Sequence, residues 1–246
     1  KVRLTESGRY LLEEAQEILR RVDVAESTVR LLASGTKARL RVGYTTITGH
    51  SLVPDIAREF RITNPEVQLE LTYLTSPAQR DKILQGEIDL GFIEGAFQSS
   101  EIESHPVARH KLVALLPPDH PLTRKRALTI EDLAQEQLIM GTSSEWPTFR
   151  RFVIDAFQKA GQVLSIGQEA SSLTGILGLV TAGVGMTVFC GTPRFCGEEM
   201  IVSRPIITDP PVIVETHLAW RRASISGAMR RFVDTSLAVG KHYMIG

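Results

Sequence analysis

The sequence predicts a two-lobed α/β protein that follows a long amphipathic helix. From Leu40 onward, strand-like and helix-like stretches alternate in two consecutive series, which is typical of sheets covered by helices. The segment before them, residues 5–32, has apolar residues at heptad spacing instead. A chain of 246 residues, 43% of them hydrophobic, is long enough to bury a core in each of two lobes.

The composition narrows the class of protein. Lys plus Arg and Asp plus Glu number 28 each, so the chain has no net charge and lacks the basic excess of a domain that binds nucleic acid directly. No apolar run approaches the roughly 20 residues of a membrane span, and the N-terminus lacks the apolar core of a secretory signal. The spacing of Cys190 and Cys196 is not a common zinc pattern, so we expect buried or reduced thiols and no metal or cofactor. We therefore expect a cytoplasmic protein, although the thiols alone also fit a processed, exported one.

The opening segment, residues 1–38, is expected to be a dimerisation helix and its hinge. Thr5 is a good N-cap, and ASGTKAR at 33–39 is a polar linker that separates the helix from the next domain. A helix separated in this way needs a partner for its apolar seam, and a second copy of the chain is the simplest one. The alternative is a helix packed on its own globular domain. The expected seam residues are Leu11, Ala15, Ile18, Val22, Ala25, Val29 and Leu32.

The first series predicts a parallel sheet with helices on both faces. Asn64-Pro65 is expected to stop its first helix, and Gly86 is expected to close its second. The expected elements are a strand at 40–45, a helix at 51–65, a strand at 67–74, a helix at 76–86 and a strand at 88–93, after which KLVALLPP at 111–118 leads into the second series.

The second series predicts the other lobe. We expect residues 39–116 and 211–240 to form one subdomain and residues 117–210 to form the second, with a cleft between them. The expected elements are a strand near 137–141, a helix near 147–160, a strand near 164–170, a helix near 172–182, a strand near 184–189, a strand at 211–220 and a last helix from Ile225 to Val239.

Several strands run directly into Ser or Thr and then into a helix. Each such join offers a hydroxyl, free backbone N–H groups and the positive end of a helix dipole, which together suit a small anion such as a carboxylate. In a parallel sheet these joins meet at the carboxyl ends of the strands, where ligands bind. The alternative for any one residue is simple helix capping, and Ser76 before Pro77 has the pattern of an N-cap. The hydroxyl residues concerned are Thr45, Thr46, Thr48, Ser76, Ser144 and Thr174.

Motifs for catalysis or phosphate binding are absent from the sequence. Glu94 follows a strand and could face the cleft, but it has no evident carboxylate partner. Trp146 beside Phe149 predicts either an aromatic wall for a ligand or a lid packed on the core. Nothing in the sequence identifies a nucleophile together with a base that would activate it, so we expect a binding protein rather than an enzyme.

Five motifs in consistent order resemble the LysR-type transcriptional regulators. They are VRLTESGRYLLEEAQEIL at 2–19, LRVGYTTITGHSLVPDIAREFRITNPEVQLEL at 40–71, QGEIDLGFI at 85–93, HPL at 120–122 and GLVTAGVGMTV at 178–188. The resemblance implies a two-lobed effector domain like the type 2 periplasmic binding proteins, preceded by a linker helix that pairs subunits. It also implies that residues 1–38 begin with the end of the wing of a winged helix-turn-helix that lies upstream. Homotetramers or dimers and promoter DNA as a partner are implied as well.

Within that family the sequence is most similar to regulators of aromatic-compound degradation. This likeness implies an aromatic or dicarboxylic acid as effector, held at the first strand–helix join, before the second helix and at a loop of the second lobe. Ile47 stands where a hydroxyl residue is usual and Trp146 where a smaller one is usual, which implies a more apolar effector. The matching positions are Thr45, Thr46, Ile47, Ser76, Ser144, Trp146 and Phe149.

Two other functions compete with a ligand-responsive regulator. A solute-binding protein of a transport system would share the two lobes, but it would act largely as a monomer, which the heptad helix disfavours. A small-molecule enzyme on the same fold would need an acid or base linked to turnover, and Glu94 would be the residue to test.

Overall fold

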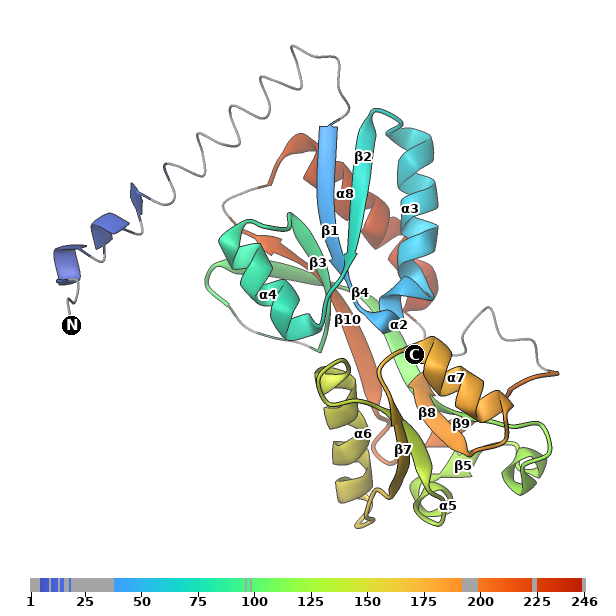
Figure 1. Ribbon diagram of the computed structural model, residues 1–246. Helices are drawn as coiled ribbons and strands as arrows, with labels where there is room; N and C mark the ends of the chain where they lie inside the picture. Colours follow the sequence, from blue (N-terminus) through green and yellow to red (C-terminus); the bar gives the residue numbers. More distant parts are fainter. Residues whose placement is uncertain are drawn as a thin grey trace.

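Two strands, β4 (Ile102–Leu116) and β10 (Ile213–Arg221), connect the two lobes of the molecule (Figure 1). The computed structural model describes residues 5–8, 10–12, 14, 15, 18, 38–95, 97, 99–191, 199–222 and 225–244. The side chains of β4 change cores along its length, since Ala108 packs in the first lobe and Leu112 in the second. β10 behaves in the same way, with Leu218 in the first core and Val214 in the second.

The first lobe is built from both ends of the globular part. β1 pairs with β2 and with β3 in parallel, and the last β1–β2 pair is Tyr44 opposite Tyr73, so all three strands end at one edge. The elements are β1 (Ala38–Tyr44), α2 (Thr46–Gly49), α3 (Leu52–Thr63), β2 (Val67–Tyr73), α4 (Ser76–Gln85), β3 (Leu90–Glu94), α8 (Gly227–Gly240) and the 3-10 turn η2 (Lys241–Tyr243).

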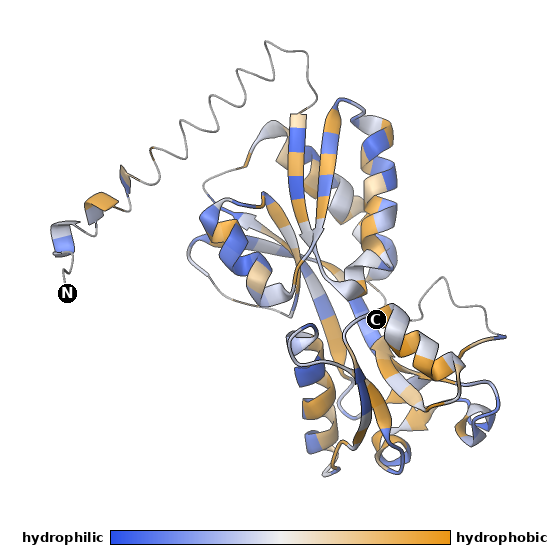
Figure 2. Ribbon diagram, in the orientation of Figure 1, coloured by the Kyte–Doolittle hydropathy of each residue, from blue (hydrophilic) through white to orange (hydrophobic). Residues whose placement is uncertain are grey.

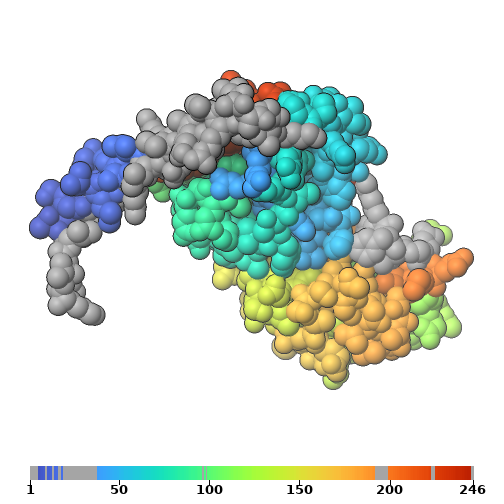
Figure 3. Space-filling view, turned by 45° about the horizontal axis from the view of Figure 1, so that its top comes forward, coloured from blue at the N-terminus to red at the C-terminus, as the bar shows by residue number. Residues whose placement is uncertain are grey.

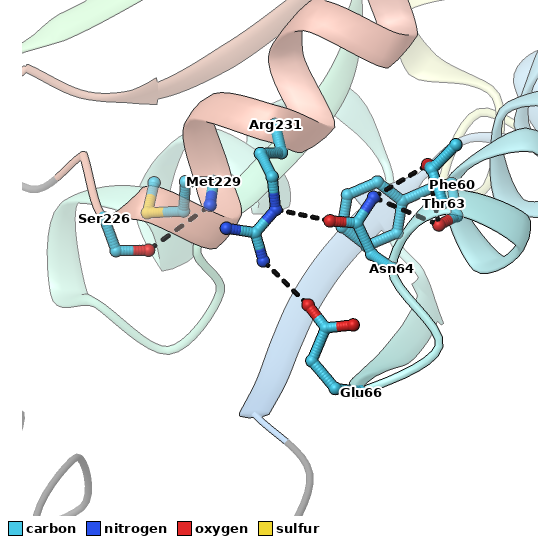
Figure 4. A network of polar contacts seen from close by, with 7 residues as sticks. All are labelled: Phe60, Thr63, Asn64, Glu66, Ser226, Met229 and Arg231. Carbon is cyan, nitrogen blue, oxygen red and sulfur yellow. Dashed lines mark hydrogen bonds and ion pairs between the residues drawn. The ribbon is translucent and has the colours of Figure 1, made fainter.

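Polar contacts fix α8 against the end of α3 (Figure 4). Arg231 on α8 donates to the Asn64 side-chain oxygen and makes an ion pair of 3.0 Å with Glu66. Asn64 is buried, and its amide nitrogen donates to the Phe60 carbonyl at 3.2 Å. Because Phe60 and Phe232 are also in edge-to-face contact in the core below, α3 and α8 form one rigid layer.

Helix α4 lies in a groove made by two glycines of the sheet. A Cβ atom on Gly91 would lie 2.6 Å from Gln79 Oε1, and one on Gly43 would lie 2.9 Å from it. Gln79 is fully buried, and its Nε2 donates to the Leu74 carbonyl at 2.9 Å. The position of α4, and so of Ser76 at its first turn, depends on glycine at these two positions of β1 and β3.

The second lobe encloses its own core of aliphatic and aromatic residues. Hydrophobic residues, orange in Figure 2, recur along its strands and helices. β6 pairs in parallel with β7 and β8, while β4 runs antiparallel to β8 and β9. The elements are η1 (Pro121–Arg124), β5 (Leu128–Thr129), α5 (Ile130–Ala134), β6 (Leu138–Gly141), α6 (Pro147–Lys159), β7 (Ile166–Ala170), α7 (Leu173–Thr181), β8 (Met186–Cys190) and β9 (Val202–Ile207).

The two-lobed α/β fold is confirmed, and so is the parallel sheet expected of the first series, since β1 pairs in parallel with β2 and with β3. The strands that pass between the lobes enter each sheet antiparallel to a neighbour, so the connected sheet is mixed. The long strand β4 was not expected, because its first half carries His, Ser and Pro side chains that are partly solvent-exposed. β5, α5 and β9 were not expected either.

The described part of the opening segment is helical. Leu11 is 68% exposed and Ile18 59% exposed, so the chain by itself does not cover these two seam residues. The expected seam residues Val22, Ala25, Val29 and Leu32 lie outside the described residues, as does Cys196. None of the described helices is long and apolar enough to cross a membrane.

Candidate functional site

A cleft lies where the carboxyl ends of β1, β2 and β3 meet the loop before α6. In the space-filling view the two lobes lie against each other, blue to green above and yellow to orange below (Figure 3). The lining combines hydroxyls and one tyrosine from the first lobe with an aromatic wall from the second. The residues are Thr45, Thr46, Tyr73, Thr75, Ser76, Glu94, Glu145, Trp146, Pro147, Thr148 and Phe149.

The first join is shaped by a capping box. Thr45 caps α2, and its backbone N–H donates to Thr48 Oγ1 at 3.1 Å while its own Oγ1 accepts from the Thr48 N–H at 3.5 Å. Thr48 is fully buried, so its hydroxyl serves the turn. Thr46 is half-buried and lines the cleft beside Thr45.

The second join brings Ser76 against the third strand. Ser76 Oγ accepts from the backbone N–H of Glu94 at 3.0 Å, which ties the first turn of α4 to the end of β3. The N-cap of α4 is Thr75, not Ser76 as expected, because Pro77 and Ser76 already belong to the helix. The Ser76 hydroxyl is therefore free to donate a hydrogen bond while it accepts one.

Tyr73 and Glu145 close the cleft from opposite lobes. The Tyr73 hydroxyl donates to the Glu145 carbonyl oxygen at 3.1 Å and lies 3.3 Å from its carboxylate. The space between the lining residues is about 10 Å³, which is room for about one water molecule. Burial raises the pKa of Tyr73, and the nearby Glu145 and Glu94 carboxylates raise it further, against a hydrogen bond from Thr46. The lobes must move apart before a larger molecule can enter.

Glu94 is the buried acid of the cleft. It is 9% exposed, and burial raises its pKa from 4.5 to about 7, while a hydrogen bond with Thr45 acts in the opposite direction. Burial also raises the pKa of the Cys190 thiol well above its usual value, and the neighbouring Glu94 adds to this effect. Cys190 is a buried, free thiol, as expected.

Trp146 and Phe149 combine the two roles that the sequence left open. The Trp146 indole N–H donates to the Ser171 carbonyl at 3.0 Å, and the ring packs on Gly141 and on Phe189. At 5% and 3% exposure, Trp146 and Phe149 belong mainly to the core of the second lobe. Their remaining surface forms one wall of the cleft.

A second, larger cavity of about 820 Å³ is lined by residues of α2, α3, β8 and α8. Ile47 and Cys190 line it together with His110 of β4. Tyr243 also lines it, and its hydroxyl makes hydrogen bonds to the Asp55 carboxylate at 2.5 Å and to the Ser51 carbonyl at 3.1 Å.

The structure brings together six of the ten expected ligand-binding residues: Thr45, Thr46, Ser76, Glu94, Trp146 and Phe149. Four others lie outside the cleft lining. Ile47 is buried in the core of the second lobe and also lines the larger cavity. Thr48 is buried, and its hydroxyl bonds within the capping box. Ser144 is exposed and bonds to Thr142, while Thr174 is exposed inside α7, which Ser172 caps.

Sequence reasoning missed Tyr73 and Glu145. Tyr73 is the last residue of β2 and so had the same signal as Thr45, a polar side chain at a strand end, although it is not a small hydroxyl residue. Glu145 sits between two residues that were selected, yet only the closure of the lobes gives it a partner.

Comparison with known proteins identifies the family to which these features correspond. The model of the LysR substrate binding domain matches residues 33–241. The HTH-type transcriptional regulator AlsR of Bacillus subtilis is 32% identical over 186 residues, which cover 76% of this chain and 62% of AlsR. CatR of Pseudomonas putida is 30% identical over 187 residues, which cover 76% of this chain and 64% of CatR. The chain thus matches less than two thirds of the length of these regulators.

Solved structures share the fold at low sequence identity. The BenM effector binding domain with its effector benzoate has a TM-score of 0.75 and 22% identity, covering 84% of this chain and 94% of that one. The QuiR effector binding domain in complex with shikimate has a TM-score of 0.73 and 18% identity, covering 85% and 100%. Full-length CbnR with its target DNA has a TM-score of 0.76 and 23% identity, covering 97% and 83%.

Proposed function

Since the chain belongs to the LysR substrate-binding domain family, we propose that it is the effector-sensing and oligomerising part of a transcriptional regulator. Its effector is a small organic acid, aromatic or dicarboxylic, bound in the cleft between the lobes. The observation that carries this proposal is the gathering of Thr45, Ser76 and the first turns of α4 and α6 around one closed cleft. Helix N-termini and hydroxyls favour a carboxylate. The named relatives with bound ligands hold benzoate and shikimate, both of which are carboxylates.

The effector acts by changing how the lobes sit relative to each other. It binds the arrangement in which both lobes contact it more tightly than the other arrangement, and this difference in affinity shifts the equilibrium between them. The two subdomains that move are residues 39–116 with 211–240, and residues 117–210. The shift reaches promoter DNA through a winged helix-turn-helix outside the present sequence, carried by the dimerisation helix. The protein acts in the cytoplasm and catalyses no reaction. A solute-binding role in transport is not favoured, since the relatives in the comparison are transcriptional regulators.

Ser76 provides the test of the ligand site. We expect benzoate, shikimate or another acid of a small panel to raise the melting temperature and to change the fluorescence of Trp146. Ser76→Ala should weaken that binding about tenfold or more, because one hydrogen bond to a charged group is lost. The matched control is Ser172→Ala, which removes the N-cap of α7 outside the cleft. It should lower stability by about 1 kcal/mol and leave the effect of the acid intact.

Two results would contradict the proposal. One is binding that Ser76→Ala and Ser172→Ala leave equally strong, which would place the ligand elsewhere, for example in the larger cavity. The other is a panel without any effect on melting or fluorescence.

A further inference from the structure

The charges of the cleft are unusual for a site that receives an anion. Among the described residues that line it, two are carboxylic acids, Glu94 and Glu145, and none is Lys, Arg or His. Hydroxyls and the first turns of α4 and α6 are the groups that favour a negative charge there. An anionic effector would therefore meet a second negative charge if Glu94 were ionised.

Every described element around Glu94 lacks a positive partner for it. The titratable groups that face it are Tyr73 on β2, Cys190 on β8 and Glu145 before α6. Thr216, its neighbour on β10, is uncharged, and on the α4 side Ser76 Oγ accepts from the Glu94 backbone N–H. The Thr45 hydroxyl is the group that bonds its carboxyl.

Two negative charges within a few ångströms in a site closed to water repel each other strongly. A neutral carboxyl group has no such cost, and its O–H can donate to the carboxylate of the effector. The arrangement of hydroxyls, helix ends and a buried acid is therefore complementary to an anion only while Glu94 carries its proton.

We propose that the cleft binds its effector as an anion together with one proton, which is held by the Glu94 carboxyl. This inference rests on the proposed function and adds a regulation to it: the regulator senses acidity and the organic acid at one site. When Glu94 is ionised before binding, uptake of the anion also takes up one proton from solvent. Burial raises the pKa of Glu94 to about 7, so this coupling acts near neutral pH.

The first measurement is the titration of Glu94 in the whole chain. In protein labelled with ¹³C at the Glu side-chain carboxyls, the Glu94 signal is the one that Glu94→Gln removes. We expect its midpoint near neutral pH. A midpoint below 5 overturns the proposal, whether or not any probe binds.

The second measurement is the affinity of benzoate, shikimate and acetate between pH 5.5 and 8.5, with benzamide as a neutral counterpart of benzoate. Above the Glu94 midpoint, each carboxylate that binds should lose about tenfold in affinity per pH unit. Glu94→Gln, which mimics the neutral carboxyl, should bind with an affinity that does not change with pH. Glu145→Gln, the matched change at the other cleft acid, should keep the dependence of the natural protein.

Equal pH dependence in Glu94→Gln and in the natural protein would overturn the proposal, and so would tighter binding of benzamide than of benzoate. Failure of the proposed function looks different. In that case none of the probes binds at any pH, while the Glu94 titration still gives its own answer.

Discussion

Glu94 lies at the end of a strand, where a carboxylate would normally reach water. Here the neighbouring Ser76 and Thr45 turns and the second lobe cover it, so that it is 9% exposed, and the described residues that line the cleft include no Lys, Arg or His. A carboxyl in such a place is stabilised in its neutral form by the cost of desolvating the charge. The same physical cost that affects ligand binding must also affect folding.

The stability of the protein should therefore fall as Glu94 ionises. Its pKa is raised from 4.5 to about 7 in the folded chain, so between these pH values the folded state holds a proton that the unfolded state has lost. The free energy of unfolding should decrease as pH rises through this window, by up to roughly 3 kcal/mol from Glu94 alone, and then level off. In urea unfolding at pH 5, 6, 7 and 8, Glu94→Gln should lack this contribution. Parallel pH profiles for the two proteins would show that Glu94 ionises normally.

At the scale of elements, the site depends on how closely α4 approaches the sheet. Gly43 and Gly91 leave space for the buried Gln79 side chain, and this contact sets the depth at which the first turn of α4 and Ser76 meet β3. The two glycines thus act on the cleft without touching a ligand. Packing in protein interiors is dense enough that a single methyl group at such a contact must move its neighbours.

Gly91→Ala should displace α4 and lower the free energy of unfolding by about 1–3 kcal/mol. We also expect weaker effector binding, because the Ser76 hydroxyl moves with the helix. The matched control is Gly178→Ala in α7, where a Cβ atom would meet nothing within 4 Å. It should raise stability by about 0.5–1 kcal/mol through helix propensity. Urea unfolding of both variants checks the pair, and a Gly91→Ala protein as stable as the natural one would contradict the role of the groove.

At the scale of the whole molecule, we assign ligand sensing to the two lobes and pairing of subunits to the opening segment. The lobes share β4 and β10, so a change of their angle passes through two continuous strands. Leu11 and Ile18 remain mostly exposed in the single chain, although residues of this kind lower the free energy when buried. Pairing of two chains would cover them and would link the lobes of one subunit to those of another.

The double change of Leu11→Asp and Ile18→Asp should weaken self-association, by about tenfold or more for each side chain removed from the seam. Sedimentation velocity over a range of protein concentrations measures this. Glu6→Ala, an exposed position of the same segment on the face opposite the seam, should leave the assembly unchanged. If the double variant assembles as strongly as the natural chain, the subunits pair through another surface.

The sequence by itself determined the order of most elements, the two lobes, the helical start of the opening segment and most of the residues that line the cleft. These follow from local signals: apolar periodicity, Pro and Gly at helix ends, and Ser or Thr where strands end, as at Thr45 and Ser76. The tertiary structure decided which side chains face the cleft. It buried Ile47 in the core of the second lobe, since one residue of offset in a short turn reverses the direction of a side chain. It also left Thr174 exposed on α7, outside the cleft. It also decided the mixed direction of the sheet, the contact between Tyr73 and Glu145 and the burial of Glu94. These features arise where segments distant in the chain meet, because the environment of a charge is set by its spatial neighbours and not by the residues beside it in the sequence.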